Sequence, residues 1–150
     1  MTDLSYTITR VLPEEYDELL DLWEASVRAT HHFLKEENIL FFKQTIYEHN
    51  YFEMVELNCI RNEGGKILGF SGAIDDSLEM LFLHPDAIGK GIGKALLNHA
   101  VNTQKISKVD VNEQNNQALQ FYLHHGFKVI SRSELDGTGK PFPILHLELS

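Results

Sequence analysis

The sequence predicts an α/β fold in which helices flank a central mixed, mostly antiparallel sheet. The chain has 150 residues, of which 43% are hydrophobic, enough for the core of one domain spanning 1–150. Segments with alternating apolar residues are interspersed with segments of helical spacing, in the order βααβββαβαββ. A glycine-bearing connection of hairpin length, 62–65, joins two of the strands and favours antiparallel pairing there.

The N-terminal half is predicted to contain two helices among four strands. The expected elements are a strand at 6–10, helices from Pro13 through Val27 and over 35–47, and strands at 54–61, 66–74 and 78–83. Pro13 suits the first turn of its helix, and apolar residues follow it at helical spacing. The lone Cys59 lies on the apolar face of a strand, which favours a buried hydrophobic role over a reactive thiol and excludes a disulfide within one chain.

The C-terminal half is predicted to alternate helices and strands before closing with two strands. The expected elements are a helix with its apolar face over 92–100, a strand at 108–111, a helix that stops at Gly126, and strands at 128–133 and 145–149. Asn112 and Asn115 are both predicted to cap the second of these helices. Alternating leucines over 145–149 permit a homodimer contact through the last strand.

A glycine-rich turn follows the strand that ends before Pro85. It reads Gly89-Lys90-Gly91-Ile92-Gly93-Lys94 and leads into an amphipathic helix. Glycines let the backbone approach an anion closely, and the N–H groups and dipole of a helix N-terminus stabilise negative charge. A Walker A loop does not fit because Ala95 follows Lys94, and a dinucleotide fingerprint would lie nearer the start of the chain. The turn predicts a site for a phosphorylated cofactor.

A second motif lies about one strand and one helix further on, Asn115-Asn116-Gln117-Ala118-Leu119-Gln120-Phe121-Tyr122-Leu123-His124-His125-Gly126-Phe127. In order and spacing, the two motifs resemble the signatures of the GNAT superfamily of N-acetyltransferases over 78–130. Trp23–Leu34 and Gly139–Pro143 resemble one bacterial branch of it, which extends the match to nearly the whole chain. The resemblance implies the same α/β fold, acetyl-CoA as cofactor, and strands that splay apart around the pantetheine arm.

The resemblance also implies a set of cofactor-binding residues in and beside the two motifs. They are Leu81, Phe82, Leu83, Ile88, Gly89, Lys90, Gly91, Ile92, Gly93, Lys94, Asn112, Asn115, Ala118 and Phe121. The superfamily usually has Arg or Gln where this chain has Ile88, so one side-chain contact to the pyrophosphate is missing. A catalytically weak acyl-CoA-binding or protein-interaction module with the same fold is therefore the alternative hypothesis, and Tyr122 argues against it.

Acetyl transfer to an amine needs a neutral nucleophile, a polarised thioester carbonyl and a proton for the leaving thiolate. The resemblance implies Tyr122 as the proton donor and backbone N–H groups near 81–83 as the polarising groups. Glu79 lies on the strand before the glycine turn and is the candidate base, acting through water. The structural alternatives are a core aromatic ring for Tyr122 and a solvated strand carboxylate for Glu79.

The acceptor pocket is expected beside the end of the first helix. His31, His32 and Phe33 lie there, and an imidazole titrating near neutrality could serve as the base instead of Glu79. Capping and surface polarity are the structural alternatives for this histidine pair. The turn at 136–143 is predicted to border the same entrance. The acceptor could be a protein lysine, a protein N-terminus or a small amine, and we favour a lysine or other primary amine.

The composition disfavours several other classes of function. With 22 acidic and 13 basic residues, the net charge of −9 disfavours nucleic-acid and anionic-membrane partners but suits a cationic acceptor. No apolar run approaches a membrane span, and the start Met1-Thr2-Asp3-Leu4 lacks signal-peptide features, so we expect a cytoplasmic protein. Neither a His-Glu-x-x-His nor a Gly-x-Ser-x-Gly motif is present, and no metal site or serine hydrolase is predicted.

Overall fold

A sheet of seven strands organises the computed structural model, which describes residues 6–150; the start at Met1–Leu4 lies outside the described residues. Its order is β1-β2-β3-β4-β5-β7-β6. The strands are β1 (Ile8–Arg10), β2 (Glu56–Arg61), β3 (Ile67–Ile74), β4 (Ser77–Leu83), β5 (Lys108–Asn112), β6 (Phe127–Ser133) and β7 (Ile144–Leu149). All neighbours pair antiparallel except β4 and β5, which are parallel. The predicted mixed, mostly antiparallel sheet is confirmed.

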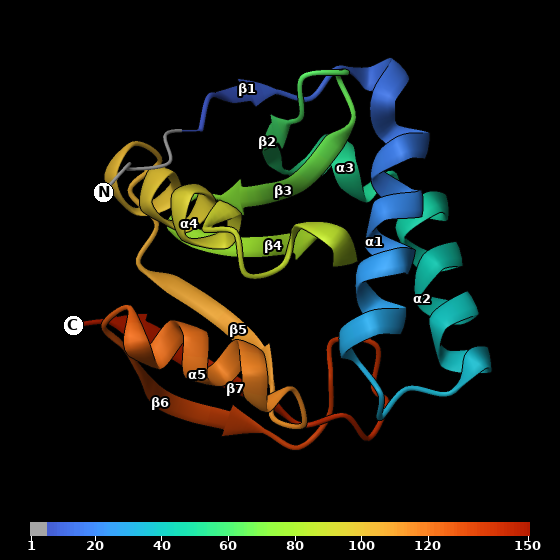
Figure 1. Ribbon diagram of the computed structural model, residues 1–150. Coiled ribbons are helices and arrows are strands. Elements are labelled where there is room, and N and C mark those ends of the chain that lie inside the picture. Colours follow the sequence, from blue (N-terminus) through green and yellow to red (C-terminus); the bar gives the residue numbers. More distant parts are fainter. Residues whose placement is uncertain (1–5) are drawn as a thin grey trace.

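Helices cover both faces of this sheet. They are α1 (Tyr16–Thr30), α2 (Glu36–Glu48), α3 (Tyr51–Met54), α4 (Ile92–Asn102) and α5 (Asn116–His124), with short 3-10 turns at Pro13–Glu15 and Pro85–Ala87. Figure 1 shows α1 and α2 together on one side of the sheet, and α4 and α5 on the other. The predicted order of elements is confirmed, apart from the one-turn helix α3.

The prediction of a strand from residue 54 was wrong at its start. Asn50 has a left-handed backbone with φ 49°, which separates α2 from α3, and β2 begins only at Glu56. Asparagine tolerates this conformation better than most residues with a Cβ atom. Helix α3 places Phe52 in the core, 6% exposed, so burial of this ring accompanies the extra turn.

Three apolar clusters hold the helices on the sheet, and the third and smallest packs the start of α4 against β2. The first contains Leu19, Trp23 and Val27 of α1 with Phe70 of the sheet, and the second joins α4 and α5 to β5 and β7. Cys59 is fully buried in the first cluster, as predicted, and burial raises the pKa of its thiol. A free thiol in these surroundings behaves as a small hydrophobic side chain.

The last strand, β7, lies inside the sheet between β5 and β6. Leu145 and Leu147 pack in the second apolar cluster. Their alternation is explained by the protein's own core, and it gives no support to a dimer contact through this strand.

The sheet consists of two antiparallel halves joined by one short parallel pairing. β4 and β5 pair only at Ser77 with Lys108 and at Leu78 with Val109. Beyond these residues β4 continues to Leu83 and β5 to Asn112, and Figure 1 shows β5 diverging from β4. The predicted splay is confirmed, and the backbone groups of β4 that face β5 beyond Leu78 have no strand partner.

A β-bulge lies in β4 next to this divergence. Gly72 and Ala73 are consecutive in β3 but pair with Met80 and Leu78, so Glu79 is an extra residue in β4. Leu78 packs in the second apolar cluster and Met80 in the first, on opposite faces of the sheet. Bulges are frequent beside active sites because they redirect side chains. Here the bulge leaves the Glu79 side chain exposed at the point where the strands part.

Candidate active site

A cleft of about 510 Å³ occupies the space between the diverging strands. β4 and β5 form its walls, the glycine turn and α5 lie along one end, and the C-terminal end of α1 closes the other. The cleft brings together residues from position 26 to position 122, far apart in the chain. A long, narrow cofactor arm suits a gap of this form between two strands.

The glycine turn forms an anion cradle at one end of the cleft. Gly89 and Gly91 have φ of +82° and +81°, a conformation that favours glycine. Gly91 is the N-cap of α4, and no side chain caps this helix N-terminus. The first turn of α4 also carries no acidic residue. Its free N–H groups and positive dipole end are therefore available to a phosphate, which fits the predicted cofactor.

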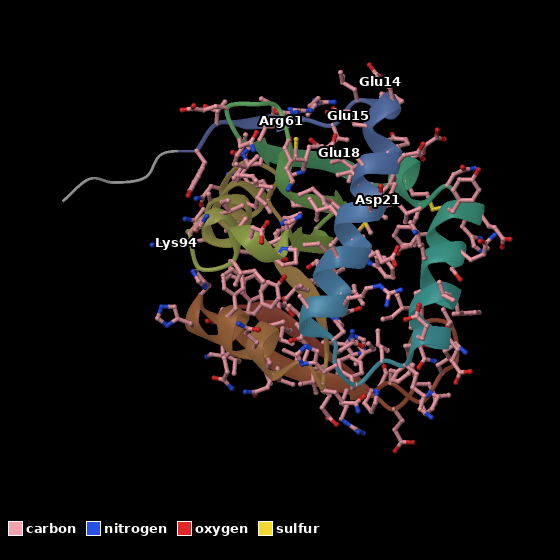
Figure 2. All side chains as sticks on the ribbon, turned by 45° about the vertical axis from the view of Figure 1, so that its right-hand side comes forward. Glu14, Glu15, Glu18, Asp21, Arg61 and Lys94 are labelled. Carbon is pink, nitrogen blue, oxygen red and sulfur yellow. The ribbon has the colours of Figure 1, made fainter. Side chains whose placement is uncertain are left out.

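The two lysines of the turn are placed differently. Lys94 lines the cleft, and Figure 2 shows it on the opposite side of the molecule from Glu14, Glu18 and Asp21 of α1. Lys90 does not line the cleft; its carbonyl oxygen accepts a hydrogen bond from the Tyr6 hydroxyl at 2.5 Å. The positive charge beside the cradle thus comes from Lys94, while the acidic face of α1 lies away from it.

Ile88 and Ile92, both predicted as cofactor-binding residues, have different environments. Ile88 lines the cleft beside Gly89 and is 39% exposed. Ile92 is 1% exposed, packs in an apolar cluster under α4 and does not line the cleft. An apolar side chain at position 88 gives no charged contact to a phosphate, whereas the Ile92 side chain anchors the helix whose N-terminus lies at the cleft.

Helix α5 presents its apolar side to the cleft. Ala118, Phe121 and Tyr122 all line it. Tyr122 is 6% exposed and packs edge-on against Phe127, and its hydroxyl makes no hydrogen bond with any residue that the structure describes. Burial raises the pKa of Tyr122, so its phenol stays protonated over the physiological range.

The N-terminus of α5 is capped by a single asparagine. The Asn115 side chain accepts a hydrogen bond from the Ala118 N–H at 3.2 Å. Asn112 was predicted to share this role, and that prediction was wrong: it is the last residue of β5, and its carbonyl oxygen accepts from the Asn115 N–H at 2.9 Å. Both asparagines line the cleft.

A chain of hydrogen bonds crosses the cleft from α5 to α1. Thr30 Oγ1 donates to the Ser26 carbonyl oxygen at 2.8 Å, so it accepts from His31 Nδ1, also at 2.8 Å. His31 Nε2 is then free to accept from Asn115 Nδ2 at 3.4 Å. One neutral tautomer of His31 satisfies all these bonds and links the two sides of the cleft.

The prediction of a base titrating near neutrality was wrong for His31. Burial, with a smaller effect from His32, lowers the pKa of His31 to about 4. The imidazole is therefore neutral at physiological pH and serves as a hydrogen-bonding link.

Glu79 lines the cleft from β4 with an exposed side chain. It lies near Tyr51 of α3, and its charge adds to the effect of burial in raising the pKa of Tyr51. Glu79 therefore faces the side of the sheet that α1 and α3 cover. A carboxylate exposed at this point can exchange protons with water in the cleft.

Aromatic rings border the cleft at the end of α1. The rings of His31 and Phe33 lie 5.5 Å apart, and Phe142 from the β6–β7 connection lies 5.9 Å from Phe33 and 6.2 Å from Phe42. The predicted turn at 136–143 therefore reaches the α1–α2 connection, as Figure 1 also shows. His32 is exposed, and neither His32 nor Phe33 lines the cleft itself.

Several cleft-lining residues were not identified from the sequence. They are Ser26, Thr30, Leu78, Met80, Val109, Asp110, Val111 and Gln117. Ser26 and Thr30 are four residues apart on α1, a spacing that could have indicated a shared helix face. Asp110 stood out only as a charged residue between two buried valines, which is the ordinary pattern of a half-exposed strand.

Two features are absent from the described part of the chain. No group of three or more His, Cys, Asp or Glu residues among 6–150 could hold a metal ion. No helix in that range is long and apolar enough to cross a membrane.

The splayed strands, the glycine cradle and the tyrosine on α5 define an acetyltransferase site, and the comparisons agree. A family model described as "Acetyltransferase (GNAT) domain" matches residues 55–129, and the chain belongs to this family. Peptidyl-lysine N-acetyltransferase YjaB of Escherichia coli K12 is 38% identical over 141 residues, 94% of this chain and 95% of the relative.

Solved structures agree with this assignment. The solution structure of apo-form YjaB from Escherichia coli matches with a TM-score of 0.84 and 36% identity, over 97% of each chain. A PaiA N-acetyltransferase from Thermoplasma acidophilum in complex with coenzyme A matches with a TM-score of 0.75 over 98% of this chain and 100% of its own. At 22% identity, this second match shows the fold alone.

The chain is therefore an N-acetyltransferase that uses acetyl-CoA. Family membership favours the enzyme over the alternative of a binding module with the same fold.

Proposed function

We propose that this enzyme acetylates the side-chain amine of lysine residues in proteins, by direct attack of the amine on the acetyl group. The observation that carries the proposal is an exposed carboxylate, Glu79 of β4, that lines the cleft at the point where the two strands part. Two relatives at 38% and 36% identity are peptidyl-lysine N-acetyltransferases, which supports lysine over other amines. The net charge of −9 favours approach of a cationic acceptor.

The proposed cofactor contacts follow the cleft from the glycine turn to α5. Acetyl-CoA supplies the acetyl group as a thioester, and its phosphates are the natural ligands of the cradle at Gly89 and Gly91. Lys94 adds positive charge there. Side chains of Ile88, Ala118 and Phe121 line the path of the arm, and the unpaired backbone of β4 near Leu81–Leu83 offers N–H groups to the acetyl carbonyl.

Two side chains are proposed to move protons. Glu79 takes a proton from the acceptor ammonium through a water molecule, which leaves a neutral amine to attack. Tyr122 Oη donates a proton to the leaving sulfur. Its burial keeps the phenol protonated, so the donor is present throughout the physiological pH range. His31 is neutral there and contributes by holding Asn115 rather than by taking a proton.

The proposal is tested in two stages. Calorimetric titration with acetyl-CoA and then CoA measures binding by the purified protein. Acetyl transfer is then measured on a peptide with one lysine and a blocked N-terminus, against the same peptide with norleucine in place of lysine. Acetylation of the first peptide alone supports the proposal. Transfer only to small amines or free N-termini contradicts the lysine assignment while leaving the acetyltransferase in place.

The span 1–150 as one domain, a cytoplasmic location and a homodimer stay predictions. A sedimentation experiment at several protein concentrations would decide the oligomeric state. A dimer would have to use a surface other than β7, because this strand is paired on both sides.

A further inference from the structure

Three polar side chains from neighbouring strands form a hydrogen-bonded chain that reaches the cleft. Asp110 Oδ1 lies 2.7 Å from His146 Nδ1, and His146 Nε2 lies 2.7 Å from Ser133 Oγ. These residues belong to β5, β7 and β6, which are adjacent in the sheet. Asp110 lines the cleft, whereas His146 and Ser133 lie behind it. The mechanism described above uses none of the three.

The register of the sheet places Asp110 opposite Glu79. Leu78 and Val109 form the last pair between β4 and β5, and Glu79 and Asp110 are the next residue on each strand. Leu78 and Val109 both pack in the second apolar cluster, on the side of α4 and α5. Glu79 and Asp110 are exposed and line the same cleft. Two carboxylates therefore flank the point where the strands part.

This pair has no cationic side chain to neutralise it. Among the described residues, Glu79 forms no ion pair, and the ion-pair partner of Asp110 is His146, which is charged only if protonated. Like charges facing each other across neighbouring strands are destabilising. A compact cation between the carboxylates removes this repulsion, and a primary ammonium group offers N–H donors to both.

We propose that Asp110 and Glu79 together hold the ammonium group of the acceptor, and that His146 positions the Asp110 carboxylate for this contact. The inference rests on the proposed function, since it assigns the binding site of the amine in that reaction. An ionised carboxylate only accepts hydrogen bonds, so His146 Nδ1 carries the proton shared with Asp110. Ser133 fixes the far side of the imidazole ring.

In the proposed arrangement both carboxylates bind the ammonium group, and Glu79 has the further task of moving a proton. Asp110 binds the acceptor and is held by a second residue, as a binding group needs to be for a defined geometry. Glu79 lies on the bulge, makes no hydrogen bond with described residues, and can exchange protons with water. The acceptor class that fits is a primary alkylammonium, of which the lysine side chain is the protein example.

The test uses a small cation, so that it does not depend on turnover. n-Butylammonium chloride, a mimic of the lysine side chain, is titrated into the CoA-saturated protein, and NMR shifts of the Asp110 amide and the His146 imidazole report binding. We expect Asp110→Asn to weaken this binding at least about tenfold, the loss typical of one charge-assisted hydrogen bond. The neutral analogue n-butanol is expected to bind neither protein.

A matched control removes a charge from the same sheet face. Glu148 lies two residues from His146 on β7 and does not line the cleft. Glu148→Gln is expected to bind n-butylammonium as the wild type does, and CoA affinity is expected to stay within about twofold in both variants. Equal weakening by both substitutions would indicate a general field effect and would overturn the proposal.

The role of His146 is tested by a pair of variants. His146→Leu removes the hydrogen bond to Asp110, and His146→Asn keeps a donor near the position of Nδ1. With a lysine peptide, we expect the first variant to raise KM for the amine severalfold with little change in kcat, and the second to restore most of the affinity. A fall in kcat with unchanged KM in both variants would contradict a positioning role.

The outcomes distinguish this inference from the proposed function. Acetylation of the lysine peptide with the same amine KM in wild type and Asp110→Asn overturns the inference and leaves the function standing. Asp110-dependent binding of n-butylammonium without acetylation of the lysine peptide supports the amine site and contradicts lysine as the acceptor. If the wild-type protein does not bind n-butylammonium, the inference is wrong.

Discussion

The cofactor side and the acceptor side of the cleft are built in different ways. The cofactor side comes from one stretch of chain, β4 through α5, which spans residues 77–124. The acceptor side combines the proposed ammonium site at Glu79 and Asp110 with the end of α1, the connection after it, and the β6–β7 connection, the last of which lies about a hundred residues from α1. A continuous segment can be inherited as a sequence motif. A surface formed by separate segments can change by substitution in one segment without change in the others.

The two sides also differ in the kind of contact that they offer to a ligand. Backbone geometry dominates the cofactor side: positive φ at Gly91, an uncapped helix N-terminus and unpaired N–H groups of β4. Side chains dominate the acceptor side, among them His31, Phe33 and Phe142. Substitutions on the two sides should therefore have separable effects on cofactor and amine.

We expect the largest effect from a substitution at Tyr122, between the cofactor side and the acceptor side, and we expect it on kcat alone. Tyr122→Phe should lower kcat about 100-fold or more and leave the CoA dissociation constant within about twofold, because it removes a proton donor and keeps the buried ring. Single-turnover acetylation and calorimetry measure the two quantities. Tyr47→Phe, at a 66% exposed tyrosine outside the cleft, is the matched control. Unchanged kcat in Tyr122→Phe would remove this residue from the mechanism.

The next effect is confined to the cofactor side. Gly91→Ala places a Cβ atom on a backbone with φ of +81°, which costs about 1–2 kcal/mol and distorts the cradle. We expect CoA affinity to fall roughly tenfold while the amine KM at saturating cofactor stays constant. Gly137→Ala, where an added Cβ meets no atom within 4 Å, should change neither constant. If Gly91→Ala raised the amine KM instead, the division between the two sides would fail.

A smaller effect, on the pH dependence of stability, is expected at His31, whose hydrogen bond to Asn115 links the two sides. His31→Gln replaces an imidazole that is neutral at physiological pH and has a pKa of about 4 in the folded protein. The unfolded chain binds this proton below about pH 6.5, so the wild type loses stability as the pH falls from there toward 4. The variant lacks this loss, so the difference in unfolding free energy between wild type and variant should shrink by about 2 kcal/mol from pH 7 to pH 5.

Urea unfolding of both proteins at pH 7 and pH 5 measures the change. His125→Gln serves as a control, since that histidine lies at the other end of α5 and outside the cleft. A gap between wild type and His31→Gln that stays constant with pH would show that His31 is not buried neutral.

The smallest expected effect is a gain in affinity for CoA. Ile88→Arg introduces one of the two side chains, Arg or Gln, that are expected at this position from the resemblance, on a residue that is 39% exposed at the cleft. CoA should bind about threefold to tenfold more tightly at low salt, with less gain at high salt, because an exposed charge is screened. Calorimetry at two ionic strengths measures the gain. No change at low salt would mean that the phosphates do not pass Ile88.

The cofactor side could be predicted from the sequence better than the acceptor side. Periodicity and two motifs were enough for the order of elements and for most of the cofactor side, since these depend on residues close in sequence. The link between His31 and Asn115 could not be predicted, because it joins residues 84 positions apart. Nor could the low pKa of His31, which follows from burial by the surrounding fold.

Asp110 illustrates the limit most clearly. In sequence it is one polar residue in an alternating strand, and its position opposite Glu79 depends on the register between two strands joined by a helix. The bulge is not visible in the sequence, because Leu78-Glu79-Met80 looks like the ordinary alternation of apolar and polar residues in a strand. The short helix α3 was missed for a related reason, since one turn of chain gives no periodicity.

The extra residue in β4 has a consequence for how such an enzyme can gain or lose its activity. With Glu79 left out, Leu78 and Met80 would still pair with Ala73 and Gly72 and still pack in their separate clusters. The alternation of β4 is complete without this residue, so the fold has no need of it. A single codon insertion into an already folded ancestor could have introduced the carboxylate, and its deletion would return a well-packed protein without the proposed base.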